Sequence, residues 1–186
     1  MFKNFDRSVD VTGIAPAKSS NQRAILQKLS QQYPLLTEDV LEAVLPKKQP
    51  LNLVKCKDHI TLLMSPVLQE PVFFQVRDGP FLPTLKFLHR AGDFMPKLGI
   101  DKGGIKFILK GADVFCVGIT SPGGVIPEPL EANCPVQVMG EGKQLPLAVG
   151  ITKMSTDDIK ASTSGVAISN MHHIGDDLWK VTEWRF

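Results

Sequence analysis

Lysine recurs at every fourth position in one glycine-rich stretch near the middle of the chain. The stretch DKGGIKFILKGADVFCVGITSPGG covers residues 101–124 and contains six glycines together with Lys102, Lys106 and Lys110. Lysine side chains bind phosphate groups, and the glycine pair at 103–104 would open a helix and expose backbone N–H groups to a phosphate. These residue types at this spacing fit a site that binds a phosphate or a nucleic acid.

The same stretch predicts a helix over residues 102–110, which Asp101 caps and Gly111 ends. Its lysines would share one face, and its isoleucines and leucine would share the opposite, buried face. Phe107 would lie between the two faces, where its ring could stack on a nucleobase or insert into a protein partner. A solvated lysine face beside a half-buried Phe is the simpler alternative, and it needs no ligand.

Motifs for nucleotide, metal and disulfide chemistry are absent from the sequence. The glycines fit neither the Walker pattern G-x-x-x-x-G-K-[ST] nor the dinucleotide-binding pattern G-x-G-x-x-G. Cys56, Cys116 and Cys134 are odd in number, far apart and outside any Cys-x-x-Cys motif, so small buried core residues are expected. We therefore expect no metal ion and no cofactor.

Catalysis is the less favoured interpretation of the polar residues near the C-terminus. The adjacent His172 and His173 would point to opposite faces of a strand and could not easily act together. Asp176 and Asp177 follow Gly175, and this order indicates a turn. With no nucleophile and base at a suitable spacing, we expect no catalytic residues and a protein that is not an enzyme.

The composition is that of a globular protein with a nearly balanced charge. The 186 residues are 43% hydrophobic and 22% charged, and the formal net charge is +2. The N-terminal sequence MFKNFDRSVD does not resemble a secretory signal, and no stretch reaches the roughly 18 apolar residues of a membrane span. We therefore expect a cytoplasmic protein with no membrane partner, in which any RNA contact depends on a local patch or on a partner.

The first half of the chain predicts an α/β unit with a small antiparallel sheet. Residues 1–17 indicate a loop because they end in GIAPAK. The elements expected after it are helices from Ser19 or Ser20 to Pro34 and from Thr37 to Pro46, strands at 51–56, 59–65 and 71–77, and a helix that Gly92 ends.

The second half predicts a small β-barrel, because short strands are separated by Gly and Pro. One helical turn interrupts the strands, with Ser155 and Asp158 forming a capping box. The fold class is thus α+β, in two domains of residues 1–94 and 95–186. The barrel strands are expected at 98–100, 113–117, 134–139, 144–152, 165–173 and 178–183.

Residues 100–119, IDKGGIKFILKGADVFCVGI, resemble the start of a PUA domain, an RNA-binding module. Its pattern is an apolar residue, an Asp, two small residues, an apolar helix, Gly-Ala, and a Gly after the next strand. Gly104 departs from it mildly, since Ala is common there. The matching residues are Asp101, Gly103, Gly111, Ala112 and Gly118.

Separated segments across nearly the whole chain resemble the malignant T-cell-amplified sequence family of translation machinery-associated proteins. This resemblance implies an N-terminal pre-PUA domain followed by a PUA-type β pseudo-barrel with short helices. The segments are LPKKQP (45–50), DGPFLPTLKFLHR (78–90), EGKQLPLAVGITKMSTDDI (141–159) and DDLWKV (176–181).

The family resemblance implies a noncatalytic translation factor. Members work with density-regulated protein on the small ribosomal subunit, in reinitiation after short upstream reading frames and in the release of deacylated tRNA during recycling. No third domain follows the PUA-like region, so a density-regulated-protein-like partner in trans is expected. Its contact surface is expected mainly on the N-terminal domain.

Candidate RNA-binding residues follow from the same resemblance. PUA domains typically hold RNA, including the CCA end of tRNA, along the first helix and the glycine loop after it. Lys47, Lys48, Lys55 and Lys57 are weaker candidates for contact with ribosomal RNA, because surface lysines are usually only solvated. The predicted RNA-binding residues are Lys102, Gly103, Gly104, Lys106, Phe107, Lys110, Gly111, Ala112, Thr120, Ser121 and Pro122, with Lys143 and Lys153 extending the basic rim.

Two other functions remain open. A protein-interaction module would share this fold without contacting RNA directly, and its binding would respond little to salt, whereas lysine–phosphate contacts weaken steeply as salt rises. An accessory RNA-binding factor in RNA modification would depend on a catalytic domain, for which the N-terminal half shows no signature.

Overall fold

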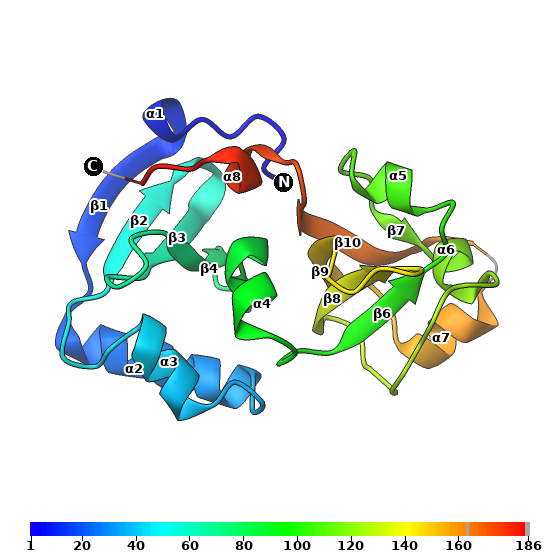
Figure 1. Cartoon of the computed structure of the whole chain (residues 1–186), viewed down its shortest axis with the longest axis horizontal. Helices are drawn as coiled ribbons and strands as arrows, with labels where there is room; N and C mark the ends of the chain where they lie inside the picture. Colours follow the sequence, from blue (N-terminus) through cyan, green and yellow to red (C-terminus); the bar gives the residue numbers. More distant parts are fainter. Residues whose placement is uncertain (163, 185–186) are drawn as a thin grey trace. The chain divides into compact units, whose positions relative to one another are not determined.

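The structure is a computed structural model that describes residues 1–162 and 164–184 (Figure 1). The chain forms two compact units, each built on its own five-stranded sheet. The first unit consists of residues 5–94 and 181–184, and the second unit of residues 1–4 and 95–180. Residues 1–4 therefore fold with the C-terminal half of the sequence, and residues 181–184 fold with the N-terminal half.

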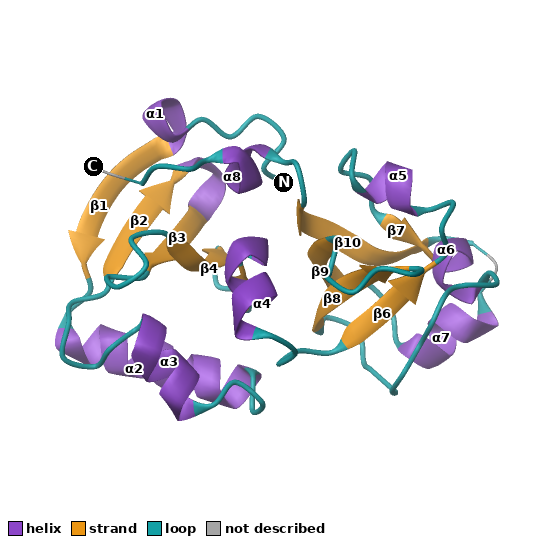
Figure 2. Ribbon diagram, in the orientation of Figure 1, coloured by secondary structure: helices purple, strands orange, loops and turns teal. Residues whose placement is uncertain are grey.

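The first unit is an antiparallel sheet with the strand order β1-β2-β3-β4-β5, accompanied by four helices and one short 3-10 helix (Figure 2). Its elements are α1 (Arg7–Asp10), β1 (Val11–Pro16), α2 (Ser19–Gln32), α3 (Glu38–Val44), β2 (Asn52–Cys56), η1 (Lys57–His59), β3 (Ile60–Met64), β4 (Pro71–Val76), β5 (Phe81–Pro83) and α4 (Leu85–Ala91).

An aromatic cluster forms the centre of the first unit. Tyr33, at the end of α2, stacks on Phe73 of β4 with ring centroids 6.2 Å apart and meets Phe94 edge to face at 5.2 Å. The Tyr33 hydroxyl donates a hydrogen bond of 2.6 Å to the carbonyl of Phe81. Burial raises the pKa of the Tyr33 phenol, so the ring enters the core as a neutral, hydrogen-bonded group.

The second unit has the strand order β6-β8-β9-β10-β7, in which β6 and β8 are parallel and the other pairs are antiparallel. The sheet curls around a core of buried aliphatic side chains, and α6 packs against both β6 and α7. Its elements are β6 (Lys97–Ile100), α5 (Ile105–Ile108), β7 (Val114–Phe115), α6 (Cys116–Thr120), β8 (Pro135–Gly140), β9 (Ala148–Thr152), α7 (Thr156–Ala161), β10 (Val166–His173) and α8 (Asp177–Lys180).

These observations confirm the fold class, an α/β unit with a small antiparallel sheet followed by a curled β unit with short helices. Local signals also hold at the helix ends. Gly92 follows α4 with φ +82°, and the Ser155 side chain accepts a hydrogen bond of 3.1 Å from the Asp158 N–H at the start of α7.

The prediction of a loop over residues 1–17 is wrong, because α1 and β1 lie there. β1 pairs with β2 in a register that sets Pro16 opposite Asn52. Gly13 and Pro16 argue against a central strand, but β1 is an edge strand, where both residues are tolerated.

Three predicted barrel strands are wrong in extent or type. The strand expected at 113–117 is limited to Val114–Phe115, because α6 begins directly after it. The strand expected at 144–152 begins only at Ala148. The segment 178–183 is not a strand, since Asp176 accepts a hydrogen bond of 2.9 Å from the Trp179 N–H and starts α8 there.

A buried hydrogen bond joins His172, near the end of β10, to Asp176 in the turn that follows. The Nδ1 atom of His172 and Oδ2 of Asp176 are 2.7 Å apart, and both side chains are about 1% exposed. The ring of Phe2 meets His172 edge to face at 5.8 Å, and the Asp177 N–H donates to the Phe2 carbonyl at 3.0 Å. The turn predicted at 175–177 is present, and it serves to bury a carboxylate rather than to expose it.

We expect acidification to destabilise the second unit through His172. Burial lowers the pKa of His172 from its usual 6.5, and this effect outweighs the hydrogen bond that His172 donates to Asp176, which raises the pKa. In the unfolded chain His172 therefore takes up a proton near pH 6.5, whereas in the folded chain it stays neutral. The free energy of unfolding thus decreases as the pH falls below about 6.5.

Thermal unfolding at about pH 7.5 and about pH 5.5 tests this expectation, with a drop of a few degrees in Tm for the wild-type chain. Asp176 does not contribute to the change between these two pH values, because its pKa stays below the usual 3.8. Desolvation raises this pKa, but the hydrogen bond from His172 and several weaker effects lower it by more. The control is His172→Gln, which should show a smaller drop. An equal drop in both proteins would contradict the assignment.

Candidate nucleic-acid interface

The lysine-rich stretch folds as one helical turn between two tight turns, and the prediction of a continuous helix over residues 102–110 is wrong. α5 covers only Ile105–Ile108, and residues 102–104 and 109–111 are turns. Two adjacent glycines disfavour an earlier helix start. After α5 the hydrogen bonds tighten to three-residue spacing, as from the Gly111 N–H to the Ile108 carbonyl at 2.9 Å.

The three lysines are exposed, as predicted, and the two isoleucines of α5 face the core. Leu109 departs from the prediction, because it is 37% exposed rather than buried. Phe107 is 54% exposed, and Nζ of Lys106 lies 5.0 Å from the centre of its ring. A cation over an exposed aromatic face keeps positive charge next to a stacking surface.

The backbone N–H groups at the start of the stretch are not available to a phosphate, contrary to the sequence-based expectation. Gly103 N–H donates to Oδ2 of Asp101 at 3.1 Å, and Gly104 N–H donates to Oδ1 at 3.2 Å. The Lys102 N–H donates to Oε2 of Glu141 at 2.9 Å. Glycine is favoured here because a Cβ on Gly103 would lie 2.9 Å from the Asp101 carboxylate. These glycines allow the backbone to form the turn. Any contact with a phosphate must therefore be made by side chains.

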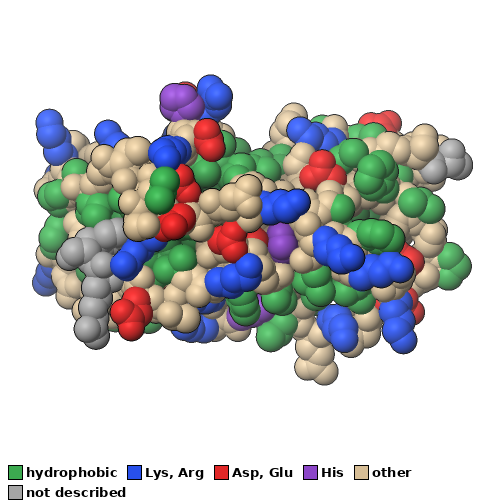
Figure 3. Space-filling view, turned by 90° about the horizontal axis from the view of Figure 1, so that it is seen from above, with side chains coloured by type: hydrophobic (Ala, Val, Ile, Leu, Met, Phe, Trp, Pro, Cys, Tyr) green, Lys and Arg blue, Asp and Glu red, His purple; other side chains and the backbone are tan. Residues whose placement is uncertain are grey.

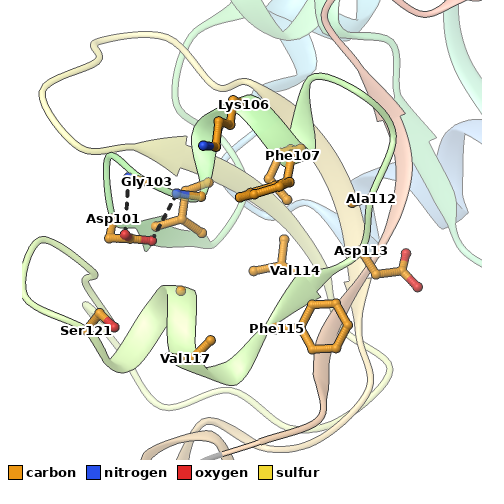
Figure 4. Close-up of a pocket in the computed structure, with 14 residues that line it drawn as sticks. Asp101, Gly103, Lys106, Phe107, Ala112, Asp113, Val114, Phe115, Val117 and Ser121 are labelled. Atoms are coloured by element: carbon orange, nitrogen blue, oxygen red, sulfur yellow. Dashed lines mark hydrogen bonds between the residues drawn. The ribbon is translucent and has the colours of Figure 1, made fainter.

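A pocket of about 600 Å³ opens between α5, β7 and α6. Figure 4 shows Phe107 on one side of it and Phe115 and Val117 on the other. Phe115 is 51% exposed and Val117 is 55% exposed, so large apolar side chains border the opening on both sides. Contiguous exposed apolar surface of this kind marks binding sites in soluble proteins.

The far wall of the pocket is fixed by the pairing of β7 with β10. Val114 lies opposite Ile168 and is buried, so the next residue, Phe115, points outward. α6 then starts at Cys116, which is fully buried, and this places Val117 on the exposed side. The carbonyl of Gly118 accepts a hydrogen bond of 2.8 Å from the Asp101 N–H, which ties α6 to the start of the lysine-rich stretch.

The loop after α6 requires glycine at one position. A Cβ on Gly124 would lie 1.9 Å from the Ile119 carbonyl oxygen, so only glycine fits. Thr120, which the sequence suggests as a free donor, donates its hydroxyl to the Cys116 carbonyl at 3.0 Å. The TSPGG segment is therefore mainly a structural turn.

The structure brings some of the predicted binding residues together and leaves others outside. The pocket lining includes Gly103, Gly104, Lys106, Phe107, Ala112 and Ser121. Outside the lining lie Lys102, Lys110, Gly111, Thr120, Pro122, Lys143 and Lys153.

Sequence analysis missed the second aromatic side chain of the pocket. The sequence predicts Phe115 and Val117 as part of a longer strand, and because all four residues of VFCV at 114–117 are apolar, the pattern does not show which of them are exposed. The remaining missed lining residues are Ile100, Asp101, Ile108, Asp113, Val114 and Gly118.

One lysine, Lys106, lines the pocket, and other lysines of the second unit are exposed outside its lining. Figure 3 shows Lys and Arg side chains next to hydrophobic ones over the half of the picture that holds the second unit. Lys102, Lys106 and Lys110 are all exposed, as are Lys143 and Lys153. This arrangement suits a ligand with an apolar, flat part for the pocket and phosphates for its rim.

Residues 1–162 and 164–184 hold no group of three or more His, Cys, Asp or Glu side chains that could bind a metal ion. In the same residues, no helix combines the length and the apolar character needed to cross a membrane.

Comparison with family models matches both halves of the chain. A Pre-PUA-like domain matches residues 5–91, and a PUA domain matches residues 96–174. The pocket and the lysine-rich stretch fall within the second match.

Several proteins are similar to this chain over its whole length. It is 41% identical over 180 residues to translation machinery-associated protein 20 of Schizosaccharomyces pombe, covering 97% of this chain and 98% of that protein. It is also 41% identical over 185 residues to malignant T-cell-amplified sequence 1 of Danio rerio, covering 100% of both. A hypothetical protein of Pyrococcus horikoshii has a solved structure with a TM-score of 0.72, 25% identity, and coverage of 91% of this chain and 99% of that one.

Proposed function

Because the chain belongs to the malignant T-cell-amplified sequence family, we propose that it is a noncatalytic, RNA-binding translation factor. The names of its relatives support a role at the translation machinery, and the PUA domain supports RNA binding. We place it in the cytoplasm, where it acts with a density-regulated-protein-like partner on the small ribosomal subunit. Its proposed roles are translation reinitiation and the release of tRNA after termination.

The CCA end of tRNA is the proposed ligand of the pocket. The observation that carries this proposal is the exposure of Phe107 and Phe115 on opposite sides of an apolar hollow beside Lys106. Nucleobases stack on exposed aromatic rings, and each such contact contributes about 1–3 kcal/mol. The volume of about 600 Å³ lies in the range typical of small-ligand pockets.

Phosphates of the same RNA would be bound by lysine side chains. The N–H groups of Gly103 and Gly104 already have carboxylate partners, so the backbone contributes little. Lys106 lines the pocket, and Lys102 and Lys110 are exposed in the same short stretch of chain. Binding through lysines releases counterions and therefore weakens as salt rises.

The test is binding of tRNA to small ribosomal subunits loaded with this protein and its presumed partner. Intact tRNA is compared with tRNA that lacks its CCA end, at about 50 and about 200 mM salt. We expect removal of the CCA end to weaken binding about tenfold or more, since at least one stacked base is lost. Higher salt should weaken binding further.

A charge-reversal variant separates RNA contact from protein contact. Changing Lys102, Lys106 and Lys110 to Glu should abolish tRNA-dependent binding, whereas Lys160→Glu on α7, outside the pocket lining, should not. The proposal would be contradicted if tRNA bound equally well without its CCA end, at higher salt and to the triple variant. That result would instead indicate a protein-interaction module.

A further inference from the structure

One buried side chain of β10 holds the turn that follows α5. Asn170 is 7% exposed, and its Nδ2 atom donates to the Ile108 carbonyl at 3.1 Å and to the Ala112 carbonyl at 2.9 Å. The Asn170 backbone N–H donates to Oδ1 of Asp113 at 2.8 Å. One residue thus bonds to the beginning and the end of the segment 108–113.

β10 meets the same turn at a second point. Gly111 has φ +88°, and a Cβ on it would lie 3.1 Å from Nε2 of His173. The backbone of the turn therefore passes close to the imidazole of His173, where a side chain would be strained and crowded. Contacts from Asn170 and His173 together fix the turn against β10.

The short helix and the turn after it depend on tertiary contacts for their stability. α5 is a single helical turn, and isolated helices of this length are unstable in water. The hydrogen bonds that follow it are short-range ones: both the Lys110 and the Ala112 N–H donate to the Phe107 carbonyl, at 3.0 and 3.1 Å. The position of Phe107 therefore depends on where β10 holds the segment behind it.

The carboxamide of Asn170 has an unfavourable feature that points to a specific role. Within the part of the chain that the structure describes, its Oδ1 atom is buried and has no hydrogen-bond partner. A buried acceptor without a partner is destabilising, and such groups are rare in folded proteins. The two donated hydrogen bonds are the gain that compensates for it. These bonds orient the amide, since the opposite orientation would set its oxygen against two carbonyl oxygens.

The held segment is the part of the chain that joins the two walls of the pocket. Phe107 and Ile108 precede the turn, and Ala112, Asp113 and Phe115 follow it, and all of them line the pocket. A displacement of the turn would move Phe107 relative to Phe115.

We propose that Asn170 is a positioning residue for the pocket, which sets Phe107 at the separation from Phe115 that admits a nucleobase. The role in ligand binding rests on the proposed function. The effect on the turn does not, because it follows from the hydrogen bonds of Asn170 alone. Both parts can be measured separately.

The main test replaces Asn170 by Leu, which has a similar volume and removes both donors without adding a buried charge. Hydrogen exchange of the Lys110, Gly111 and Ala112 amides is measured in the full-length chain without RNA. We expect exchange at these amides to be about tenfold faster or more, because loss of the anchoring bonds favours local opening. Amides of β8 and β9 should be unchanged, which excludes general unfolding.

The second measurement is the Kd of a short RNA oligonucleotide that ends in CCA. Asn170→Leu should raise the Kd about tenfold while leaving the salt dependence unchanged, because it alters no charge and the lysines that contact phosphates remain in place. Ser169→Ala, at the neighbouring position of β10, is the matched control and should change neither reading. The unchanged exchange of the β8 and β9 amides excludes a misfolded variant as the cause of the weaker binding.

A second variant approaches the same contact from the turn. Gly111→Ala puts a Cβ against His173 at a left-handed backbone position, and we expect the same two changes from it. It also keeps the test decisive if Asn170→Leu fails to fold. Unchanged exchange in the variants would overturn the proposal, and so would faster exchange with unchanged RNA affinity. If the wild-type chain does not bind the oligonucleotide while exchange is faster in the variants, the proposed function fails and the anchoring role of Asn170 is supported.

Discussion

Replacing Asp176 by Ala is expected to lower the free energy of unfolding of the second unit by about 3–5 kcal/mol, because three donors lose their acceptor and each such loss costs about 1–3 kcal/mol. The side chain is 1% exposed and accepts three hydrogen bonds. They come from Nδ1 of His172 at 2.7 Å, the His173 N–H at 3.1 Å and the Trp179 N–H at 2.9 Å. Alanine would remove the one acceptor that these three donors share.

The adjacent carboxylate provides a matched control. Asp177 pairs with Lys180 at 2.8 Å at the surface, and exposed pairs of this kind contribute about 1 kcal/mol or less. Urea unfolding of Asp176→Ala and Asp177→Ala therefore compares a buried with an exposed carboxylate one residue apart. If the two variants differed by less than about 1 kcal/mol, the buried network would not have the importance assigned to it.

The same residues show where sequence reasoning stops. The order Gly175, Asp176, Asp177 correctly indicates a turn, because turn chemistry is local. The burial of Asp176 is not local. It depends on the N-terminal Phe2 folding onto β10, a contact between residues at opposite ends of the chain, which periodicity cannot reveal.

Element types were predicted well where a segment has a strong pattern of its own. The helix predicted from Ser19 or Ser20 to Pro34 agrees with α2, and the strands at 51–56 and 71–77 agree with β2 and β4. The element type was predicted wrongly where contacts with another part of the chain determine the local structure. β1 exists because β2 offers a partner, and α8 exists because Asp176 caps it, although its sequence is apolar enough to suggest a strand.

The sequence predicts the side of the candidate site that holds the lysines and Phe107, but not the side that holds Phe115. The lysines and Phe107 are visible in the sequence because they lie close together in the stretch 101–110. Phe115 and Asn170 belong to the same site only through the pairing of β7 with β10 and the hydrogen bonds between β10 and the turn after α5. A single sequence contains no signal for such pairings.

Phe107→Ala is expected to weaken binding of tRNA about 5- to 150-fold, which corresponds to the loss of about 1–3 kcal/mol for one stacked base. Thermal stability should change little, because the side chain is 54% exposed. A buried Phe, such as Phe74 in the first unit, would instead cost about 3–5 kcal/mol of stability on truncation to Ala. The two measurements thus separate a binding residue from a core residue.

Leu145→Ala is the matched control for this change, since Leu145 is 52% exposed, lies in the second unit and does not line the pocket. Loss of an exposed apolar side chain should by itself leave tRNA binding unchanged. Phe107→Tyr should restore most of the affinity, because stacking requires an aromatic face and not a particular ring. If Phe107→Ala bound tRNA like the wild-type chain but lost affinity for the protein partner, Phe107 would belong to a protein interface. If it instead lost several kcal/mol of stability, the ring would be part of the core of the second unit.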